Sequence, residues 1–496
     1  MLNLLKRDIK QGYKGVKQLA QKSFAEGNYE ASLQYIGKCT VVAQQINWIY
    51  ADDELENLME NIGKKLIKDV PYDYHPVRNR VVFYDAFCKS FVLALQYMEA
   101  LVAAGKEIMY ITTADDLARD KPRFSDILNE LSAYPSVKIV IVPPGKRTER
   151  IAFFYDSVVG FCPEQILLHM VADAVVLPAL YVLPSAIKRY IINLADQTFW
   201  LGKKAIDYCL EFRQFGVSVS QQRRSIKPEQ QLLVPFYPID DRNPFEGFPE
   251  QCTPEKVVVF SGGDLYKVLD EKRTYWRLVK RLLDDYPNVV FLFATKISNN
   301  VNREIDSFIK DNGFEGRFIY INYRKDINEV FKHCDIYMGT CPASGSLMSQ
   351  LAAVNAKPIL QYYYPGTPDD ETEQAICYND KFSISFRDED SFMEEAHRLI
   401  TDVEYRKMQG ERLKKAMITP EQFKSLVADT LSTNHTRVPL EPFDVDYSLL
   451  DDRWLALEKA GYVDVMPFVC GILGKKYVRR HMPWTFIRKY VRILKN

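Results

Sequence analysis

Short apolar runs alternate with helix-length segments through most of the chain. From residue 80 the runs VVFY, EIMYITT and VKIVIVPP are separated by segments whose apolar residues recur with helical spacing. Strands that alternate with helices predict a parallel sheet built from βαβ units. After residue 256 the alternation restarts with VVVF, VVFLFAT and RFIYIN. The pattern predicts an α/β protein with two Rossmann-like domains, at residues 78–238 and 257–430.

The segments before and between these domains have other patterns. Residues 1–77 have helical periodicity, and AEGNYEASLQYI at residues 25–36 has the glycine, tyrosine and alanine spacing of a single tetratricopeptide-like hairpin. One such unit cannot bury its own apolar face, so we expect it to pack on a neighbouring domain. Residues 239–256 are rich in proline and poor in apolar side chains. This composition is typical of a linker.

The last segment, residues 431–496, is predicted to be a helical basic tail. It ends in GKKYVRRHMPWTFIRKYVRILKN, which carries eight Lys and Arg residues and no carboxylate. Trp484 and Ile487 can share one face of a helix that is otherwise basic. Two interpretations remain open, namely contact with an anionic membrane surface and docking of the helix on the first α/β domain.

Composition narrows the function classes. The chain of 496 residues has 65 basic and 65 acidic residues, so its net charge gives no argument for binding nucleic acid. Its nine cysteines are scattered and never form CxxC, which argues against structural disulfides and zinc. The N-terminus lacks the apolar core of a signal peptide. We expect a cytoplasmic protein, held at the inner face of the membrane if the tail binds lipid.

The stretch at residues 335–360 predicts a strand, a loop of small residues, a helix and a second strand. A small-residue loop that opens a helix lets backbone N–H groups approach a phosphate, and the helix dipole favours negative charge there. We therefore predict a diphosphate site at Thr340, Ser344, Gly345 and Ser346. Taken alone, a Ser-Gly-Ser sequence at a helix start is also typical of a helix cap.

A second glycine loop, in FSGGDLYK, follows the first strand of the second domain. Gly262 and Gly263 lie at the predicted strand end, and Lys267 comes just beyond them. An ammonium group at this place can bind phosphate oxygens. A single loop lysine is usually a solvated charge, but two phosphate-binding elements in one α/β domain support each other. We expect both loops to bind the same nucleotide.

The order of two Rossmann-like domains, a linker and a helical tail resembles the GT-B glycosyltransferases. The DLYK of residues 264–267 is similar to the motif that carries the uridine-diphosphate-contacting lysine in the O-linked N-acetylglucosamine transferases and the bacterial protein N-glycosyltransferases. The helix start at residues 344–346 resembles the donor diphosphate turn of that group, and a helical N-terminal region is also one of its features. The resemblance implies that the second domain binds a nucleotide sugar, with UDP as the nucleotide, and that the first binds a glycan or protein acceptor.

Two departures from the family pattern affect the expected chemistry. The loop has Ala343, Ser344 and Gly345 without the histidine of the O-linked transferases, and residues 347–358 contain no carboxylate, so the Glu-x7-Glu pattern of many retaining enzymes is absent. This favours inverting transfer. The two acid-x-acid patterns at residues 388–390 and 444–446 precede helix-compatible segments and are interpreted as caps. The six histidines never pair at metal-ligand spacing. We expect neither a metal nor another cofactor.

An inverting transfer needs a base for the acceptor and charge stabilisation for the leaving diphosphate. Asp196 follows a strand-like segment and precedes two aromatic residues, so it is the first candidate base, with a helix cap as its other interpretation. Asp85, at the end of the first strand, is the second candidate. Asp370 and Glu371 are candidate ligands of sugar hydroxyls, although such clusters are usually solvated.

The leading hypothesis is a glycosyltransferase that moves a sugar from a nucleotide sugar to a cell-surface polysaccharide intermediate or a protein. A nucleotide-sugar epimerase is a second possibility, because that chemistry also occurs on two Rossmann-like domains. A non-catalytic GT-B relative that binds a glycan or protein is the third, because no base is unmistakable in the sequence.

Overall fold

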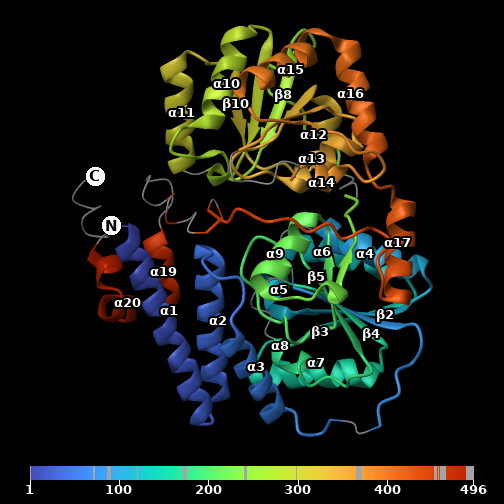
Figure 1. Ribbon diagram of the computed structural model, residues 1–496. Helices are drawn as coiled ribbons and strands as arrows, with labels where there is room; N and C mark the ends of the chain where they lie inside the picture. Colours follow the sequence, from blue (N-terminus) through green and yellow to red (C-terminus); the bar gives the residue numbers. More distant parts are fainter. Residues whose placement is uncertain are drawn as a thin grey trace. The chain divides into compact units, whose positions relative to one another are not determined.

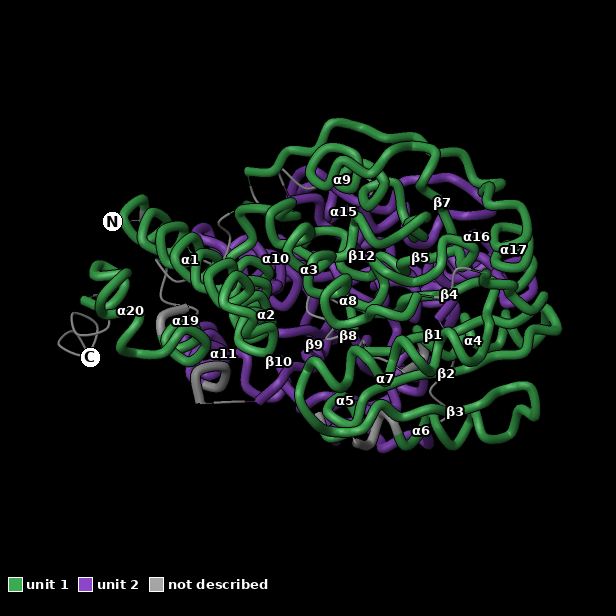
Figure 2. Tube along the Cα trace, turned by 90° about the horizontal axis from the view of Figure 1, so that it is seen from below, with its two compact units in different colours: residues 1–234, 424–496 green, residues 235–423 purple. Residues whose placement is uncertain are grey.

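The computed structural model divides the chain into two compact units (Figures 1 and 2). Unit 1 comprises Met1–Val234 and Lys424–Asn496, and unit 2 comprises Pro235–Phe423. The first unit is therefore built from both ends of the chain, with the second inserted between them. The structure describes residues 2–70, 73–86, 91–119, 121–170, 176–238, 243–297, 299–364, 371–448, 450–451, 455, 457 and 465–487.

Unit 1 is organised around a parallel sheet of seven strands in the order β3-β2-β1-β4-β5-β6-β7. Its strands are β1 (Arg80–Asp85), β2 (Glu107–Thr113), β3 (Val137–Val142), β4 (Gln165–His169), β5 (Lys188–Ile192), β6 (Tyr208–Glu211) and β7 (Gln231–Leu233). The helices between them are α4 (Phe91–Ala103), α5 (Ala114–Arg119), α6 (Lys121–Ser132), α7 (Arg147–Phe161), α8 (Leu177–Leu180) and α9 (Gln214–Arg224). Helices α7 and α8 cover one face and α4, α6 and α9 the other (Figure 1).

Three N-terminal helices, α1 (Leu2–Ala25), α2 (Tyr29–Ile46) and α3 (Asp53–Leu66), share the apolar core of this sheet. Helices α1 and α2 form the expected hairpin, and its packing on a neighbouring domain is confirmed. The buried carboxylate of Glu56 links α3 to the loops around the sheet of unit 1, since it accepts hydrogen bonds from the hydroxyl of Tyr181 and the amide of Gly202. Burial raises the pKa of Glu56 above its ordinary value.

The C-terminal part of the chain returns to unit 1 through α17 (Pro420–Thr433), α19 (Val465–Leu473) and α20 (Lys475–His481). Between α17 and α19 the prediction of a helical tail is wrong for residues 434–448. This segment is non-helical and lies along α9, where Gln214 and Gln222 donate to the carbonyls of Pro439 and Phe443. Within the described residues, no helix has the length and apolarity needed to cross a membrane.

Unit 2 contains a second parallel sheet, in the order β10-β9-β8-β11-β12-β13. Its strands are β8 (Val257–Gly262), β9 (Val289–Ala294), β10 (Phe318–Ile321), β11 (Ile336–Met338), β12 (Ile359–Tyr362) and β13 (Ser385–Phe386). Its helices are η2 (Leu265–Val268), α10 (Thr274–Asp285), α11 (Asn299–Asn312), α12 (Ile327–His333), α13 (Ser346–Val354), α14 (Glu373–Ile376), α15 (Glu389–Thr401) and α16 (Val403–Ala416). The two parallel sheets confirm the predicted fold class.

The predicted linker at residues 239–256 belongs to unit 2 wherever the structure describes it, from residue 243 on. The ring of Phe245 stacks on His333 with centroids 3.9 Å apart, and the amide of Glu246 donates to Asp326 at 2.7 Å. Composition suggested a free linker because apolar residues are few. The two aromatic residues Phe245 and Phe248 nevertheless attach this segment to the core of unit 2.

Both sheets reverse their strand order beside their first strand. In unit 1 the reversal lies between β1 and β4, and in unit 2 it lies between β8 and β11. Open α/β sheets bind ligands at the carboxyl ends of the strands at such a switch point. A ligand site is therefore expected at the residues that follow these four strands.

Candidate functional site

In unit 2 the loop after β11 is held in a compact conformation at the start of α13. The hydroxyl of Thr340 donates to the carbonyl of Ala343 at 2.6 Å, and the peptide bond between Cys341 and Pro342 is cis. Gly339 gives the loop room, because a Cβ there would lie 1.8 Å from the side-chain oxygen of Gln361. The backbone can therefore turn directly from the strand into the helix.

The loop after β8 meets this turn, as expected from the sequence. The amide of Ala343 donates to the carbonyl of Lys267 at 3.2 Å, and the Lys267 ammonium lies 3.5 Å from the carbonyl oxygen of Ser344. Gly263 has a φ of +153°, and a Cβ there would lie 3.0 Å from Cδ of Lys267. The glycine thus lets the lysine fold back towards the start of α13.

The N-terminus of α13 has room for an anion. Its N-cap residue is Gly345, no side chain in the described part of the chain caps the helix, and its first turn carries no carboxylate. Beside it, the hydroxyl of Ser344 is buried with no hydrogen-bond partner among the described residues. The first N–H groups of a helix attract negative charge, and the ammonium of Lys267 adds to this potential. The arrangement suits a diphosphate.

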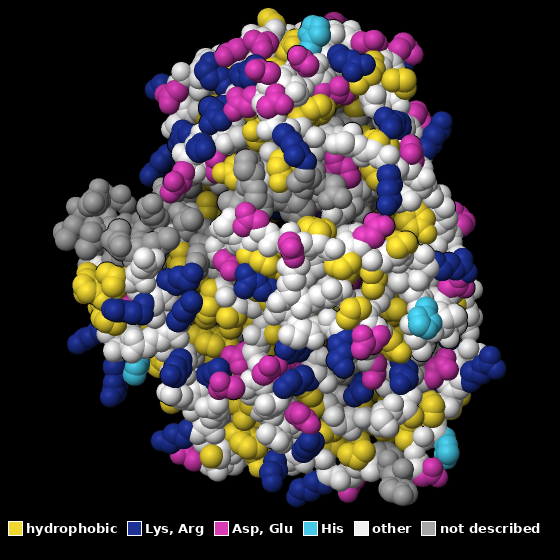
Figure 3. Space-filling view, viewed as in Figure 1, with side chains coloured by type: hydrophobic (Ala, Val, Ile, Leu, Met, Phe, Trp, Pro, Cys, Tyr) yellow, Lys and Arg dark blue, Asp and Glu magenta, His cyan; other side chains and the backbone are white. Residues whose placement is uncertain are grey.

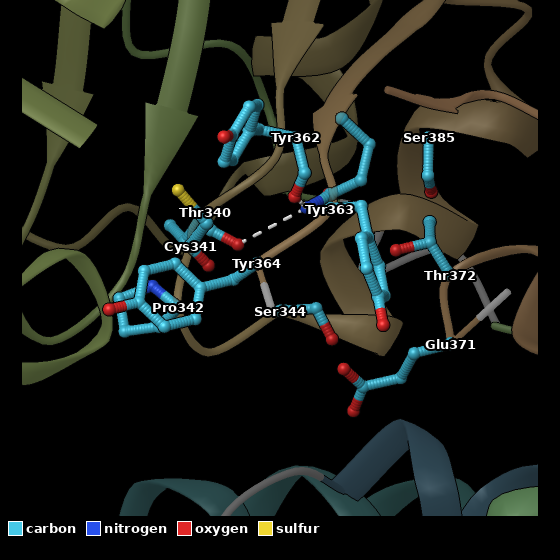
Figure 4. Close-up of a pocket in the computed structure, with 11 residues that line it drawn as sticks. Thr340, Cys341, Pro342, Ser344, Tyr362, Tyr363, Tyr364, Glu371, Thr372 and Ser385 are labelled. Carbon is cyan, nitrogen blue, oxygen red and sulfur yellow. Dashed lines mark hydrogen bonds between the residues drawn. The ribbon is translucent and has the colours of Figure 1, made fainter. Parts of the chain in front are cut away.

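A pocket opens beside this turn (Figure 4). Glu371 and Ser344 lie on one side of it, with the Glu371 carboxylate pointing towards the serine hydroxyl (Figure 4). Tyr364 is positioned by Asp270, which accepts its hydroxyl proton at 3.1 Å. The pocket is lined by Thr340, Cys341, Pro342, Ser344, Gln361, Tyr362, Tyr363, Tyr364, Glu371, Thr372 and Ser385.

Part of this lining could be predicted and part could not. Thr340, Ser344 and Glu371 line the pocket, whereas Asp370 lies outside the described residues. The run of tyrosines after β12 was missed, although its position at the end of a strand beside the diphosphate loop was the available signal. Cys341 is an unsuitable nucleophile, since burial raises the pKa of its thiol well above the ordinary value.

In unit 1 Asp85 ends β1 and lies opposite His169 at the end of β4. Its two carboxylate oxygens contact Nδ1 of His169 at 2.8 Å and the hydroxyl of Tyr110 at 2.7 Å. The side chains of Asp85 and His169 are both fully buried. This cluster lies at the switch point of the sheet. Sequence reasoning singled out Asp85 and missed His169, because the pairing of β1 with β4 is not visible in the sequence.

Asp196, the first candidate base, has a different environment. Its side chain is fully buried, and Arg213 holds both carboxylate oxygens, with Nε at 2.7 Å and Nη2 at 3.0 Å. The aromatic residues expected to line a sugar pocket, Phe199 and Trp200, are also buried. Because the guanidinium binds both oxygens of the fully buried carboxylate, this geometry fits a structural ion pair better than a base.

Asp388 caps α15, as predicted, by accepting the amide proton of Ser391 at 2.8 Å. Asp446 accepts the amide proton of Ser448 at 2.9 Å in a turn, so the helix cap predicted there is wrong. Among the described residues, no three His, Cys, Asp or Glu side chains form a group that could hold a metal ion. Independence from metals stays a prediction.

Replacing Gly345 by Leu tests whether the start of α13 binds a diphosphate. Its φ of −117° suits any residue, and a Cβ would meet its neighbours at 3.5 Å or more, so we expect the protein to fold. The longer side chain should keep phosphate from the amides and weaken UDP binding by about tenfold. Calorimetry with UDP measures this. Gly37→Leu on α2 is the control and should leave the affinity unchanged; equal affinities in both variants would contradict the assignment.

Comparison with known proteins gives a fold but no close relative. No family model matches the chain, and no curated protein sequence matches it. A variant of the O-GlcNAc transferase of Thermobaculum terrenum aligns over 86% of this chain and 81% of its own, with a TM-score of 0.53 and 13% identity. A Listeria monocytogenes protein described as a UDP-N-acetylglucosamine 2-epimerase aligns over 74% of this chain and 100% of its own, with a TM-score of 0.50 and 9% identity. The chain has a GT-B glycosyltransferase-like fold, which confirms the resemblance seen in the sequence.

Proposed function

We propose that this protein is a glycosyltransferase that takes its sugar from a nucleotide diphosphate donor bound in unit 2. The observation that carries the proposal is the contact of Lys267 with the Ser344 turn, at the open N-terminus of α13 and at the switch point of the sheet. The amides of residues 344–346 bind the diphosphate, and the ammonium neutralises the charge that builds up on it as the sugar leaves. Lys267 and the helix supply this charge in the proposal, which therefore includes no metal.

The donor in this proposal is a UDP-linked hexose or N-acetylhexosamine. The names of both fold relatives refer to N-acetylglucosamine, and one refers to its UDP form. The lining of the pocket supports a sugar ligand, because a carboxylate such as Glu371 accepts hydrogen bonds from hydroxyls and the neighbouring tyrosines offer apolar ring surface. The acceptor is a polysaccharide intermediate or a protein that offers a hydroxyl or amide.

The acceptor-side base in the proposal is His169, positioned by Asp85. A carboxylate that accepts the Nδ1 proton leaves Nε2 as the basic atom of the imidazole. Nε2 takes the acceptor proton while the acceptor oxygen or nitrogen bonds to the anomeric carbon and the bond from that carbon to the phosphate oxygen breaks. The departing UDP carries the negative charge. Since His169 is buried, the acceptor has to gain access to Nε2 when it binds.

A nucleotide-sugar epimerase is the second candidate function, favoured by the Listeria fold relative. The third is a non-catalytic binding protein, favoured by the full burial of Asp85 and His169. All three candidates bind a nucleotide sugar or a glycan, so affinity alone does not separate them.

Incubation of the full chain with a panel of nucleotide sugars and acceptor extracts tests the proposal. We expect release of UDP that depends on an acceptor, because transfer breaks the bond between sugar and phosphate. Coupled detection of free UDP and chromatography of the remaining donor are the measurements. Isomerised donor without free UDP would identify an epimerase. If no donor is consumed with any acceptor, the enzyme proposal fails.

A further inference from the structure

One surface of unit 1 combines strong positive charge with exposed apolar side chains. It is formed by α1, by α20 and by the helical residues 483–487, and we call it the basic face. Six Lys and Arg residues lie within residues 2–25 and four within residues 465–487, against a single carboxylate, Asp8. Figure 3 shows basic side chains gathered around a hydrophobic patch over these helices, at the left edge of the view.

The one acidic group does not offset this charge at the surface. Asp8 is buried, and its Oδ2 accepts the amide protons of Trp484 at 2.7 Å and Thr485 at 3.0 Å, together with the hydroxyl proton of Thr485 at 3.3 Å. It therefore acts as a cap for residues 483–487. This hydrogen bond holds the backbone of Trp484 next to Asp8, although the two residues lie 476 positions apart in the sequence.

Helices α1 and α20 are packed closely enough to act as one body. A Cβ at Gly12 would lie 2.5 Å from the sulfur of Met482, and the hydroxyl of Tyr477 donates to the carbonyl of Gly12 at 2.9 Å. A Cβ at Gly15 would lie 2.4 Å from the same hydroxyl. These glycines let the two helices approach, so that charges from both ends of the chain share one surface.

The exposed side chains of this surface include cations and two large apolar groups, beside neutral polar residues such as Gln11 and Gln18. Trp484 and Ile487 are 46% and 48% exposed and lie one helical turn apart. Two cations of α1 are paired, since Lys22 contacts Glu26 and Lys17 contacts Asp52 and Glu54. The other exposed cations form no ion pair with a described carboxylate, and they are Arg7, Lys10, Lys14, Lys475, Lys476, Arg479 and Arg480. In water the unpaired cations of this surface have no counter-charge, and its two large apolar side chains stay exposed to solvent.

We propose that the basic face binds the surface of a bilayer that contains anionic phospholipids. Lipid phosphates complement the cations, and the boundary between head groups and acyl chains takes up an indole ring and an aliphatic side chain. A nucleic acid would satisfy the charges but would not bury an isoleucine. The proposal goes beyond the nucleotide-binding function of unit 2 and does not depend on it, because vesicle binding needs no sugar donor.

Sedimentation of the full chain with vesicles tests this proposal. The vesicles are an equal mixture of phosphatidylglycerol and phosphatidylcholine, and phosphatidylcholine alone serves as the neutral surface. We expect binding to the anionic vesicles that weakens with added salt. The double substitution Arg479→Gln and Arg480→Gln should lower the partition coefficient by roughly 30-fold, since each cation near an anionic surface contributes several-fold.

A matched control separates the basic face from general surface charge. Lys414 and Lys415 are adjacent, exposed and helical like Arg479 and Arg480, but they lie on α16 of unit 2. Changing both to Gln should leave vesicle binding intact. If this control pair weakens binding as much as the arginine pair, or if neither pair changes it, the basic face is not the binding surface.

Brominated lipids supply a second readout that does not depend on charge. Bromine quenches an indole that inserts among the acyl chains, so we expect quenching in the unmodified chain that is lost in Trp484→Phe. Binding without this loss of quenching would overturn the apolar part of the proposal. Binding of a short DNA duplex in place of vesicles would overturn the whole proposal and assign the basic face to nucleic acid.

Discussion

Asp85→Asn should lower the turnover number for sugar transfer by about 10²–10⁴-fold while leaving UDP affinity unchanged. In the proposed function the carboxylate, 2.8 Å from Nδ1 of His169, accepts the Nδ1 proton, so that Nε2 is the atom that takes the acceptor proton. An amide in its place can donate its own proton to Nδ1, which puts the imidazole proton on Nε2 and removes the base. Steady-state kinetics with the donor found in the panel, together with calorimetry for UDP, measure both quantities.

Asp196, the other candidate base of unit 1, provides the control. Asp196→Asn removes the negative charge that Nε and Nη2 of the buried Arg213 guanidinium contact, which should destabilise the fold by about 3–5 kcal/mol. The fraction of protein that stays folded should turn over normally. Thermal unfolding and kinetics on both variants distinguish the two carboxylates. Loss of turnover in the Asp196 variant at unchanged stability, with normal turnover in the Asp85 variant, would reverse the assignment.

Variants around Asp85 sharpen this test. His169→Asn should cost as much turnover as Asp85→Asn, and the double variant should cost little more, because the two residues act as one unit. Tyr110→Phe removes the hydrogen bond to the other carboxylate oxygen and leaves the contact between Asp85 and His169 in place, so we expect a smaller effect. Additive losses in the double variant would indicate that the two residues act separately.

Lys267→Ala should weaken UDP binding by about 10–100-fold, which is the usual effect of losing a hydrogen bond to a charged group. The ammonium lies at the start of α13, beside the site proposed for the diphosphate. Uridine has no phosphate, so its affinity should not change. Calorimetry with both ligands on both proteins measures the difference.

Two comparisons decide how this result is interpreted. Lys280→Ala removes an exposed lysine of α10 that pairs with Asp284, and it should affect neither ligand. If Lys267→Ala weakens uridine and UDP equally, the lysine supports the shape of the loop and does not bind phosphate. Unchanged affinity for both ligands would remove the observation on which the proposed function rests.

The sequence was sufficient for the fold because buried parallel strands are continuous apolar runs. It also placed Lys267 and the Ser344 turn at strand ends, and strands of a parallel sheet end at the same edge. It could not show that β1 lies beside β4, so the contact between Asp85 and His169 was missed. Asp196 illustrates the converse, because a carboxylate after a strand has the same local pattern whether it serves as a base or pairs with an arginine 17 residues later.

The cap that Asp8 forms on residues 483–487 also has a consequence for biosynthesis. A ribosome makes α1 long before the segment that packs against its glycines, so unit 1 cannot close until residues 475–487 have emerged. Unit 2 is one continuous stretch and can complete its contacts earlier. During translation part of the apolar surface of the N-terminal hairpin therefore stays uncovered, and we expect a chaperone to bind the nascent chain there.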